Sequence, residues 1–188
     1  KNFGIKHILI VDDTFTVNPE RVKKICELML KKDINIEWFC FAHVNTISED
    51  LVRLMKRAGC FSIGFGVESA DEDVLKKMKK NISLERCEKA FEISNKLGIK
   101  TQAFFIFGNK GDTPETIEKT INFACKLKPV LAFFNMMIPY PGTEVFKELC
   151  GTKYCESNTD WTDFVGIGVN PAVDTFSLSK KEQQRYMY

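Results

Sequence analysis

The sequence predicts an α/β protein built from repeated strand–helix units around a parallel sheet. Three observations lead to this prediction. Short apolar runs alternate with longer amphipathic stretches along the chain. Each strand with its helix takes roughly 25 to 40 residues, the length of a strand plus a returning helix. The predicted strands are apolar on both faces, as parallel strands covered by helices must be.

The first two units begin with apolar runs of strand length, HILIVDD at residues 7–13 and IEWFCFAHV at residues 36–44. Asn18 is the expected N-cap of the helix after the first strand, because a proline follows it and fits the first helical position. Ser48 is the expected N-cap of the second helix. Gly59 ends that helix, since glycine readily adopts the conformation needed there.

The third strand is predicted at residues 61–67 and is followed by two helices, the second of which has Ser83 as its N-cap. The fourth strand is predicted at residues 100–108. Pro114 then lies just inside the start of the next helix. A fifth strand at residues 130–138 completes the predicted sheet.

Polar residues follow these strands, at the edge where a parallel α/β sheet places its chemistry. The turns that close the helices lie at the opposite rim, which favours a role in stability. The strand-end residues are Asp12, Asp13, His43, Asn45, Glu68, Ser69, Asn109 and the PYPGT turn at residues 139–143.

The chain has 188 residues, of which 44% are hydrophobic and 28% charged, as in an ordinary globular protein with a substantial core. Its formal net charge is +2, and Lys and Arg are dispersed among Asp and Glu, so charge implies no nucleic-acid or anionic-membrane partner. No apolar run approaches the roughly 18 residues of a membrane span, and the first residues show no cleavable signal pattern. We therefore expect a cytoplasmic protein with small-molecule ligands.

The cysteines are odd in number and lie mostly inside apolar segments, which favours reduced, buried thiols over a disulfide framework. No CxxC or CxxxCxxC pattern occurs, so spacing places neither zinc nor an iron–sulfur cluster within this chain. The seven cysteines occur at positions 26, 40, 60, 87, 125, 150 and 155.

Two of the strand-end pairs have both a functional and a local interpretation. Adjacent residues on a strand point to opposite faces, so at most one of Asp12 and Asp13 faces a site and the other caps a loop. Glu68 and Ser69 either bind a polar ligand or, in the case of Glu68, cap the helix that begins near Asp71.

The other motifs have simple structural explanations. The glycines of GFGVES match no GxGxxG pattern, and in a buried strand they indicate the close approach of a flat ligand or another backbone. FGNKGDTPET and PYPGT are explained as turns before helices capped by Thr113 and Thr143. His43 is expected to be partly buried with a local partner.

The order of these motifs carries a resemblance that no single motif carries. VDDTF is followed by FSIGFGVESADEDVLKKMKKNIS, then by LGIKTQAFFIFGNKGDTPET and finally by PYPGT. This series, over about residues 5–145, closely resembles the radical S-adenosylmethionine (radical SAM) superfamily. More narrowly, it resembles the branch of cobalamin-dependent radical enzymes, magnesium-protoporphyrin ester oxidative cyclases, methylthiotransferases and oxygen-independent coproporphyrinogen oxidases.

The resemblance implies a partial (β/α)6 barrel of the TIM type, here about five parallel strands with helices on the outer face, that binds S-adenosylmethionine at the strand ends. Gly64 and Gly66 would line the cofactor, with Glu68 and Ser69 near its polar groups. Lys80 stands where relatives keep a basic residue for the cofactor carboxylate, a group that needs a charge-assisted partner. The implied cofactor-binding residues are Asp12, His43, Gly64, Gly66, Glu68, Ser69, Lys80, Ile106 and Gly108, the last two through backbone groups offered to the adenine.

The sequence also departs from the family pattern. It lacks the CxxxCxxC loop and the Gly-Gly-Glu-like segment of relatives, so we expect it to be the carboxyl-side portion of a barrel, from the third strand onward. His43 stands where many relatives have Arg or Glu, and Asn109 and Lys110 replace a Leu-Pro pair. We expect residues 1–145 to form this portion. Residues 146–188 are expected to form an irregular segment, which includes residues 153–170, and a terminal helix with Ser179 as its candidate N-cap, packed on or extending from the barrel.

The implied function is that of a radical SAM enzyme, either an oxidoreductase or a methyl or methylthio transferase. In this family a [4Fe-4S] cluster donates an electron to S-adenosylmethionine, and the resulting 5'-deoxyadenosyl radical abstracts hydrogen from the substrate. The cluster ligands would lie outside this chain, which would be inactive alone. The parent protein would need an electron donor such as flavodoxin or ferredoxin, and the branch also implies cobalamin.

Two other functions remain open. One is a cluster-free aldolase or isomerase on a TIM-type barrel, with Asp12, His43 and Glu68 as acid and base and Lys110 as the candidate strand-end lysine. The other is a non-catalytic barrel that binds a partner. A parent protein that binds S-adenosylmethionine would argue against this second alternative.

Overall fold

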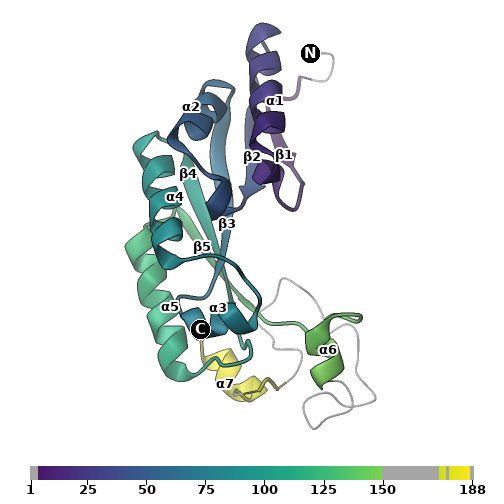
Figure 1. Ribbon diagram of the computed structural model, residues 1–188, viewed down its shortest axis with the longest axis vertical. Coiled ribbons are helices and arrows are strands. Elements are labelled where there is room, and N and C mark those ends of the chain that lie inside the picture. The colour runs from purple at the N-terminus through teal and green to yellow at the C-terminus, as the bar shows by residue number, and fades with distance from the viewer. Residues whose placement is uncertain (1–3, 150–173, 177, 187–188) are drawn as a thin grey trace. The chain divides into compact units, whose positions relative to one another are not determined.

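The computed structural model describes residues 4–149, 174–176 and 178–186. The predicted α/β fold is confirmed, because five parallel strands form one sheet in the order β1-β2-β3-β4-β5 (Figure 1). The strands are β1 (His7–Ile10), β2 (Glu37–Ala42), β3 (Cys60–Glu68), β4 (Lys100–Phe107) and β5 (Leu131–Met136).

Every predicted helix is present, with ends within a few residues of the prediction. Two short 3-10 helices, η1 and η2, were not predicted, because each is too short to show a hydrophobic period. Helix α6 was indicated only by its cap at Thr143. In chain order the helices are η1 (Phe15–Val17), α1 (Pro19–Lys31), η2 (Val44–Thr46), α2 (Glu49–Arg57), α3 (Glu72–Lys77), α4 (Leu84–Lys96), α5 (Pro114–Leu127), α6 (Glu144–Leu149) and α7 (Lys180–Arg185).

The predicted helix caps are also confirmed. In each case the side-chain oxygen accepts a hydrogen bond from a backbone N–H in the first turn, which would otherwise have no partner. These caps are Asn18, Ser48, Ser83, Thr113, Thr143 and Ser179. The predicted irregular segment at residues 153–170 lies outside the described residues, as do Cys150 and Cys155.

The chain forms two compact units. The first unit contains β1 and β2, most of β3, and helices α1, α2 and α4; the second contains α3, α6 and α7. The first unit comprises Lys1–Val67, Ile82–Phe104 and Ala124–Ala132, and the second comprises Glu68–Asn81, Phe105–Phe123 and Phe133–Tyr188.

The core of the first unit lies between the strands and the helices that cover one face of them. Trp38 on β2 is fully buried, its Nε1 donates to the carbonyl of Ala58 at 2.8 Å, and its ring meets Phe15 edge-on. Phe65 on β3 packs against Phe91 of α4, with ring centroids 5.1 Å apart. These contacts bury the face of β2 and β3 that is turned toward the helices.

The core of the second unit brings the end of the chain onto β4. Phe107, Ile117 and Met136 form a buried cluster together with Leu178, and Tyr186 packs against it. The predicted terminal helix therefore belongs to the packed part of this unit, because residues on both sides of it contribute apolar side chains to the cluster.

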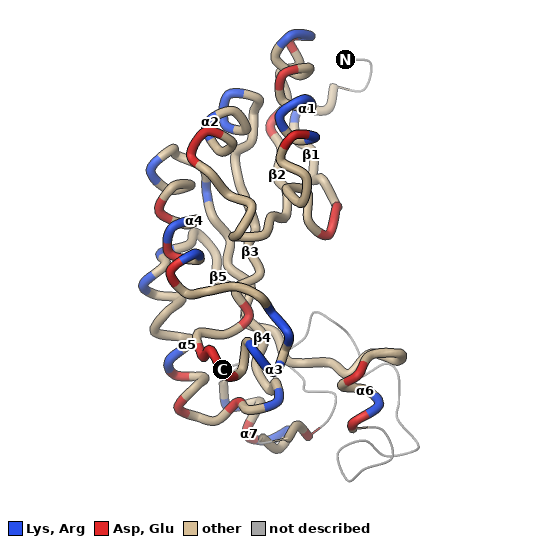
Figure 2. The backbone as a smooth tube through the Cα atoms, in the orientation of Figure 1, with Lys and Arg blue, Asp and Glu red and all other residues tan. Residues whose placement is uncertain are grey.

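Charged residues of both signs are mixed along the helices, as Figure 2 shows for α1, α2, α4 and α5. This agrees with the small net charge of +2. Among the described residues, no helix is long and apolar enough to cross a membrane.

Candidate functional site

Asp12, the first candidate, lies just after β1 in the first unit and binds its own loop. Its Oδ2 accepts a hydrogen bond from the Arg21 guanidinium at 3.0 Å, and its Oδ1 accepts one from the backbone N–H of Thr14 at 3.2 Å. Arg21 also donates to the carbonyl of Phe15 at 2.8 Å. Asp12 thus fastens the turn between β1 and α1.

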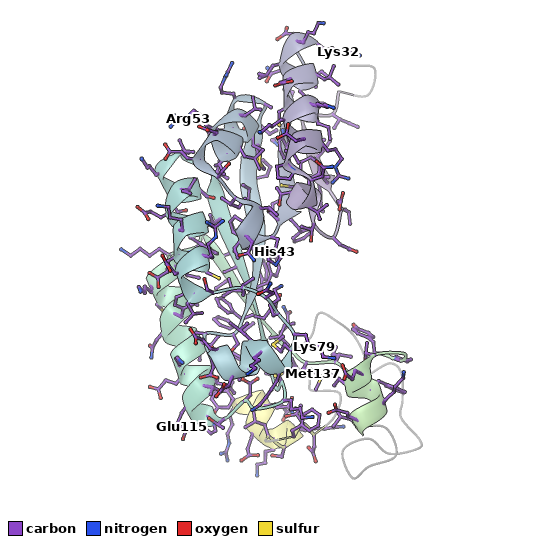
Figure 3. The ribbon with its side chains drawn as sticks, in the orientation of Figure 1. Lys32, His43, Arg53, Lys79, Glu115 and Met137 are labelled. Atoms are coloured by element: carbon purple, nitrogen blue, oxygen red, sulfur yellow. The ribbon has the colours of Figure 1, made fainter. Side chains whose placement is uncertain are left out.

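His43, labelled in Figure 3, directly follows β2 and likewise binds its own loop. Its Nδ1 accepts from the backbone N–H of Asn45 at 3.2 Å, so this nitrogen caps η2. Its backbone N–H donates to Thr16 Oγ1, which in turn lies 2.6 Å from Thr46 Oγ1. The loops after β1 and β2 are therefore joined through two threonine hydroxyls.

Arg86, which sequence reasoning did not select, holds the same loop from α4. One of its terminal nitrogens lies within hydrogen-bond distance of the carbonyls of Val44, Asn45 and Ile47, at 3.3, 3.1 and 3.4 Å. A guanidinium suits this task because its donors are planar and always charged. The sequence gives no local signal of this contact, because about forty residues separate Arg86 from the carbonyls that it binds.

The absence of a side chain at Gly64 is explained by close packing within the first unit. A Cβ at this position would lie 3.0 Å from the rings of Phe41 and Phe104 and 3.1 Å from that of Phe39. These rings lie on the face of β3 opposite Phe65, the face away from the helices. The close neighbours at Gly64 are thus aromatic side chains. Gly66, two residues further on the same strand, is half-buried, and the role of both in cofactor binding stays a prediction.

Glu68, the last residue of β3, belongs to the second unit and forms an ion pair with Lys80. Lys80 Nζ donates to Glu68 Oε1 at 2.9 Å, and the side chains are only 26% and 14% exposed. Glu68 has a φ of +67°, in the left-handed region that a residue with a Cβ rarely adopts. Such backbone strain clusters at ligand sites, where the surrounding structure maintains it.

The chain returns Lys80 to Glu68 by a short helix. Asp71 is the N-cap of α3, accepting from the N–H groups of Asp73 and Val74, so the alternative that Glu68 caps this helix is wrong. After α3 the chain reverses with Lys79 at φ +58°, and the N–H of Lys80 donates to the carbonyl of Leu75. The twelve residues from Glu68 to Lys80 therefore contain α3 and a chain reversal, which bring the two charged side chains together.

Ser69 is 1% exposed and engaged with protein groups. Its Oγ accepts from the backbone N–H of Asp71 at 3.1 Å and lies 3.4 Å from Thr120 Oγ1 on α5. The same Thr120 oxygen accepts from the N–H of Ala70 at 2.9 Å. These contacts fix the segment after Glu68, which is a positioning role for Ser69.

Ile106 and Gly108 lie at the end of β4 in the second unit. Ile106 lines a pocket of about 310 Å³ together with Asn109 and residues of β5 and the segment after it. Gly108 has a φ of +85°, and a Cβ there would lie 3.0 Å from Thr175 and 3.1 Å from Gln183. Only glycine combines this backbone conformation with so close a neighbour.

Asp112, which sequence reasoning also missed, anchors the loop after β4. It is 2% exposed, and its carboxylate accepts from the backbone N–H of Asn109 at 2.7 Å and from Thr116 Oγ1 at 3.2 Å. Burial raises the pKa of the Asp112 carboxyl despite these hydrogen bonds. The Asn109 side chain donates to the carbonyl of Ile106 at 2.7 Å, so the loop is tied back onto the strand.

Lys110 was the candidate lysine of the alternative aldolase or isomerase, and the cysteines are the candidate ligands for zinc or an iron–sulfur cluster. Lys110 pairs with Glu148 at 2.7 Å and lies over the ring of Phe176. Cys26, Cys40, Cys60 and Cys87 are buried as expected, whereas Cys125 is exposed. Burial raises the pKa of the Cys26 thiol to about 11 and raises that of Cys60 as well. Within the described part of the chain, no three His, Cys, Asp or Glu side chains are placed to hold a metal ion.

The candidates thus fall into two groups. The first unit contains four of them and the second contains five, among which Glu68 and Lys80 form an ion pair and Ser69 follows Glu68 in the chain. The first group is Asp12, His43, Gly64 and Gly66, and the second is Glu68, Ser69, Lys80, Ile106 and Gly108.

Comparison with known proteins agrees with this architecture. The family described as Radical SAM superfamily matches residues 1–124. The chain is 36% identical over 145 residues to an uncharacterised methyltransferase of Pyrococcus horikoshii, covering 77% of this chain and 32% of that protein. It is 28% identical over 189 residues to the anaerobic magnesium-protoporphyrin IX monomethyl ester cyclase of Rubrivivax gelatinosus, covering 99% and 34%. The chain therefore spans about a third of the length of these relatives.

Solved structures show the same fold. The radical S-adenosylmethionine methyltransferase TsrM from Kitasatospora setae, with cobalamin and a [4Fe-4S] cluster bound, matches with a TM-score of 0.71 at 19% identity, over 97% of this chain and 38% of that one. Coproporphyrinogen III oxidase from Escherichia coli matches with a TM-score of 0.59 at 19% identity, over 68% and 31%. The fold is thus that of the partial TIM-type barrel.

Proposed function

Because this chain belongs to the radical SAM superfamily, we propose that it is the part of a radical SAM enzyme that binds S-adenosylmethionine at the carboxyl ends of its strands. The observation that carries the proposal is the half-buried ion pair of Glu68 and Lys80, with Glu68 held at a positive φ. Glu68 does not cap the adjacent helix, since Asp71 does so.

The pair fits a zwitterionic ligand. A lysine ammonium has three N–H donors, so the bond to Glu68 leaves others that can meet the carboxylate of the cofactor. Glu68 accepts Lys80 through Oε1, and a carboxylate retains further acceptor sites for hydroxyl or ammonium groups. The segment that follows Glu68 is held in place by hydrogen bonds among Ser69, Asp71 and Thr120 and from the N–H of Ala70.

The hard chemistry of such an enzyme comes from its cofactors, S-adenosylmethionine and a [4Fe-4S] cluster, which together supply a 5'-deoxyadenosyl radical. The described residues of this chain do not fit the cluster, because no three of its potential ligands converge and the thiols of Cys26 and Cys60 have raised pKa values. Because the full sequence also has no CxxxCxxC pattern, we propose that the cluster ligands lie outside this chain.

The reaction of the whole protein is proposed from its relatives. The P. horikoshii relative is named a methyltransferase and the R. gelatinosus relative a cyclase, so methyl transfer or oxidative cyclisation is the expected class. A low-potential electron donor such as flavodoxin or ferredoxin would then be a partner. Cobalamin is proposed on the TsrM structure, which shares the fold and contains it.

Equilibrium dialysis with labelled S-adenosylmethionine tests the cofactor site. We expect the 188-residue chain to bind it and both Glu68→Gln and Lys80→Met to bind at least about tenfold more weakly, because each loses a charge-assisted contact of about 1.5–3 kcal/mol. Lys79→Met is the matched control, since Lys79 is the adjacent lysine and its side chain is 73% exposed. Equal affinities for all three variants, or a wild-type chain that binds nothing, would contradict the proposal.

Reconstitution with iron and sulfide tests the placement of the cluster. We expect the 188-residue chain to show no stoichiometric cluster absorption, because the described residues offer no converging thiolates. A stable cluster with one equivalent per chain would place the ligands within this chain instead.

A further inference from the structure

The second unit contains a pocket of about 600 Å³ that the cofactor proposal does not use. Its walls come from four segments of that unit, namely α3 with the residues just after it, the loop after β4, the segment after β5, and α6. Met78, Met137 and Val145 give it an apolar side, and Met137 and Val145 are part of one hydrophobic cluster with Leu149. Figure 3 labels Lys79 and Met137, which both line it.

Two of the lysines that line this pocket have no ion-pair partner among the described residues. Lys79 pairs with Glu144, and Lys110 pairs with Glu148, so these four charges cancel. The remaining charged lining residues are Asp73, Lys76 and Lys77. Among the described residues, neither Lys76 nor Lys77 has a carboxylate within ion-pair distance, which leaves the pocket with a net positive charge.

The loop after β4 is shaped to receive one of these lysines. Gly111 has a φ of +98°, and a Cβ there would lie 2.5 Å from Lys77 Nζ and 3.0 Å from its Cδ. The side chain of Lys77 therefore lies across the bare backbone of Gly111, in space that any other residue would occupy. Asp112, next in the chain, is buried and fixes this loop through the N–H of Asn109. The exposed side chain of Lys77 thus lies against a fixed loop at the edge of the pocket.

We propose that this pocket binds the anionic group, a carboxylate or a phosphate, of a partly apolar small molecule, with Lys76 and Lys77 as its cationic contacts. Met78, Met137 and Val145 would contact the apolar part of the ligand. A lysine ammonium is a compact charge with several rotatable donors and accepts either anion. This inference goes beyond S-adenosylmethionine binding, and it stands or fails without the cofactor.

Titration calorimetry with three probes of one shape tests the proposal. We expect 1-naphthyl phosphate and 1-naphthoate to bind the 188-residue chain at least about tenfold more tightly than neutral 1-naphthol, because only the anions meet the lysines. The stronger of the two anions identifies the preferred group. Equal affinity for naphthol, or binding of none of the three, would overturn the proposal.

Variants assign the site. We expect the double variant Lys76→Gln, Lys77→Gln to bind the preferred anion at least about tenfold more weakly, while Lys89→Gln, an exposed helical lysine outside the pocket, binds as wild type. Saturating S-adenosylmethionine should leave the affinity for the anion unchanged. Competition between the two ligands, or an unchanged affinity in the double variant, would show that Lys76 and Lys77 do not form a separate site.

Discussion

In the first unit, the polar residues at the strand ends bind their own loops, whereas in the second unit they are more deeply buried or line pockets. Asp12 keeps 39% of its side chain exposed and pairs with Arg21 across the turn that it closes. Glu68 keeps only 14% and pairs with a lysine twelve residues away. Carboxylates that follow two strands of the same sheet thus differ in their surroundings: one closes its own loop at the surface, and the other forms a half-buried ion pair.

The largest effect on stability is expected at Asp112, a buried carboxylate of the second unit. Asp112→Ala should lower the free energy of unfolding by about 2–3 kcal/mol, because the buried N–H of Asn109 and the hydroxyl of Thr116 lose their acceptor. Urea denaturation measures the change. Asp13→Ala is the control, since Asp13 is exposed in the first unit, and it should shift stability by less than about 0.5 kcal/mol.

The pH dependence gives a second measurement on Asp112. Burial raises the pKa of this carboxyl in the folded protein above its ordinary value of 3.8. The folded state therefore holds the proton more tightly, so the stabilising contribution of Asp112 is full below pH 3.8 and falls as the pH rises through the folded pKa. Relative to Asp112→Asn, wild type should lose stability across this range. A gain with rising pH would contradict the burial argument.

In the first unit, the test is whether a single arginine supports the loop after β2. Arg86→Ala should lower the free energy of unfolding by about 1.5–2 kcal/mol, because the carbonyls of Val44, Asn45 and Ile47 lose a charged donor. Arg53→Ala is the matched control, since Arg53 forms an exposed ion pair with Glu49 within α2, and its loss should cost about 0.5 kcal/mol or less. Equal costs for the two arginines would remove the special role of Arg86.

Much of the fold follows from local sequence signals. The five strands and the caps at Asn18, Ser48, Ser83 and Ser179 were predicted, because apolar periodicity and capping chemistry act within a few residues. Glu68 and Lys80 were each selected through the motif resemblance, and the structure joins them in an ion pair that was not predicted. Their role in binding the cofactor stays a prediction.

What the sequence did not reveal depends on contacts between distant segments. Arg86 reaches a loop about forty residues earlier, and Thr120 holds a segment fifty residues before it. Asp112 stands beside a predicted cap and a helix-starting proline, which were sufficient to explain its motif as a turn. Only the folded structure shows that its carboxylate is buried.

The smallest effect on stability is expected at Lys79, an exposed lysine next to Lys80. These two adjacent residues allow an exposed ion pair to be compared with a half-buried one. Lys79 and Lys80 each pair with a glutamate, but the Lys79 pair with Glu144 is 73% and 64% exposed, whereas the Lys80 pair with Glu68 is 26% and 14% exposed. Hydrogen bonding to Glu144 raises the pKa of Lys79, yet solvent screens so exposed a pair, so Lys79→Ala should leave the urea midpoint unchanged. Lys80→Ala should cost about 1 kcal/mol, because it leaves the half-buried Glu68 carboxylate without its cation. Added salt should reduce that cost only slightly, since partly buried pairs are weakly screened. If both lysines prove neutral, the Glu68–Lys80 pair contributes nothing to folding, and the expected difference between the exposed and the half-buried pair is wrong.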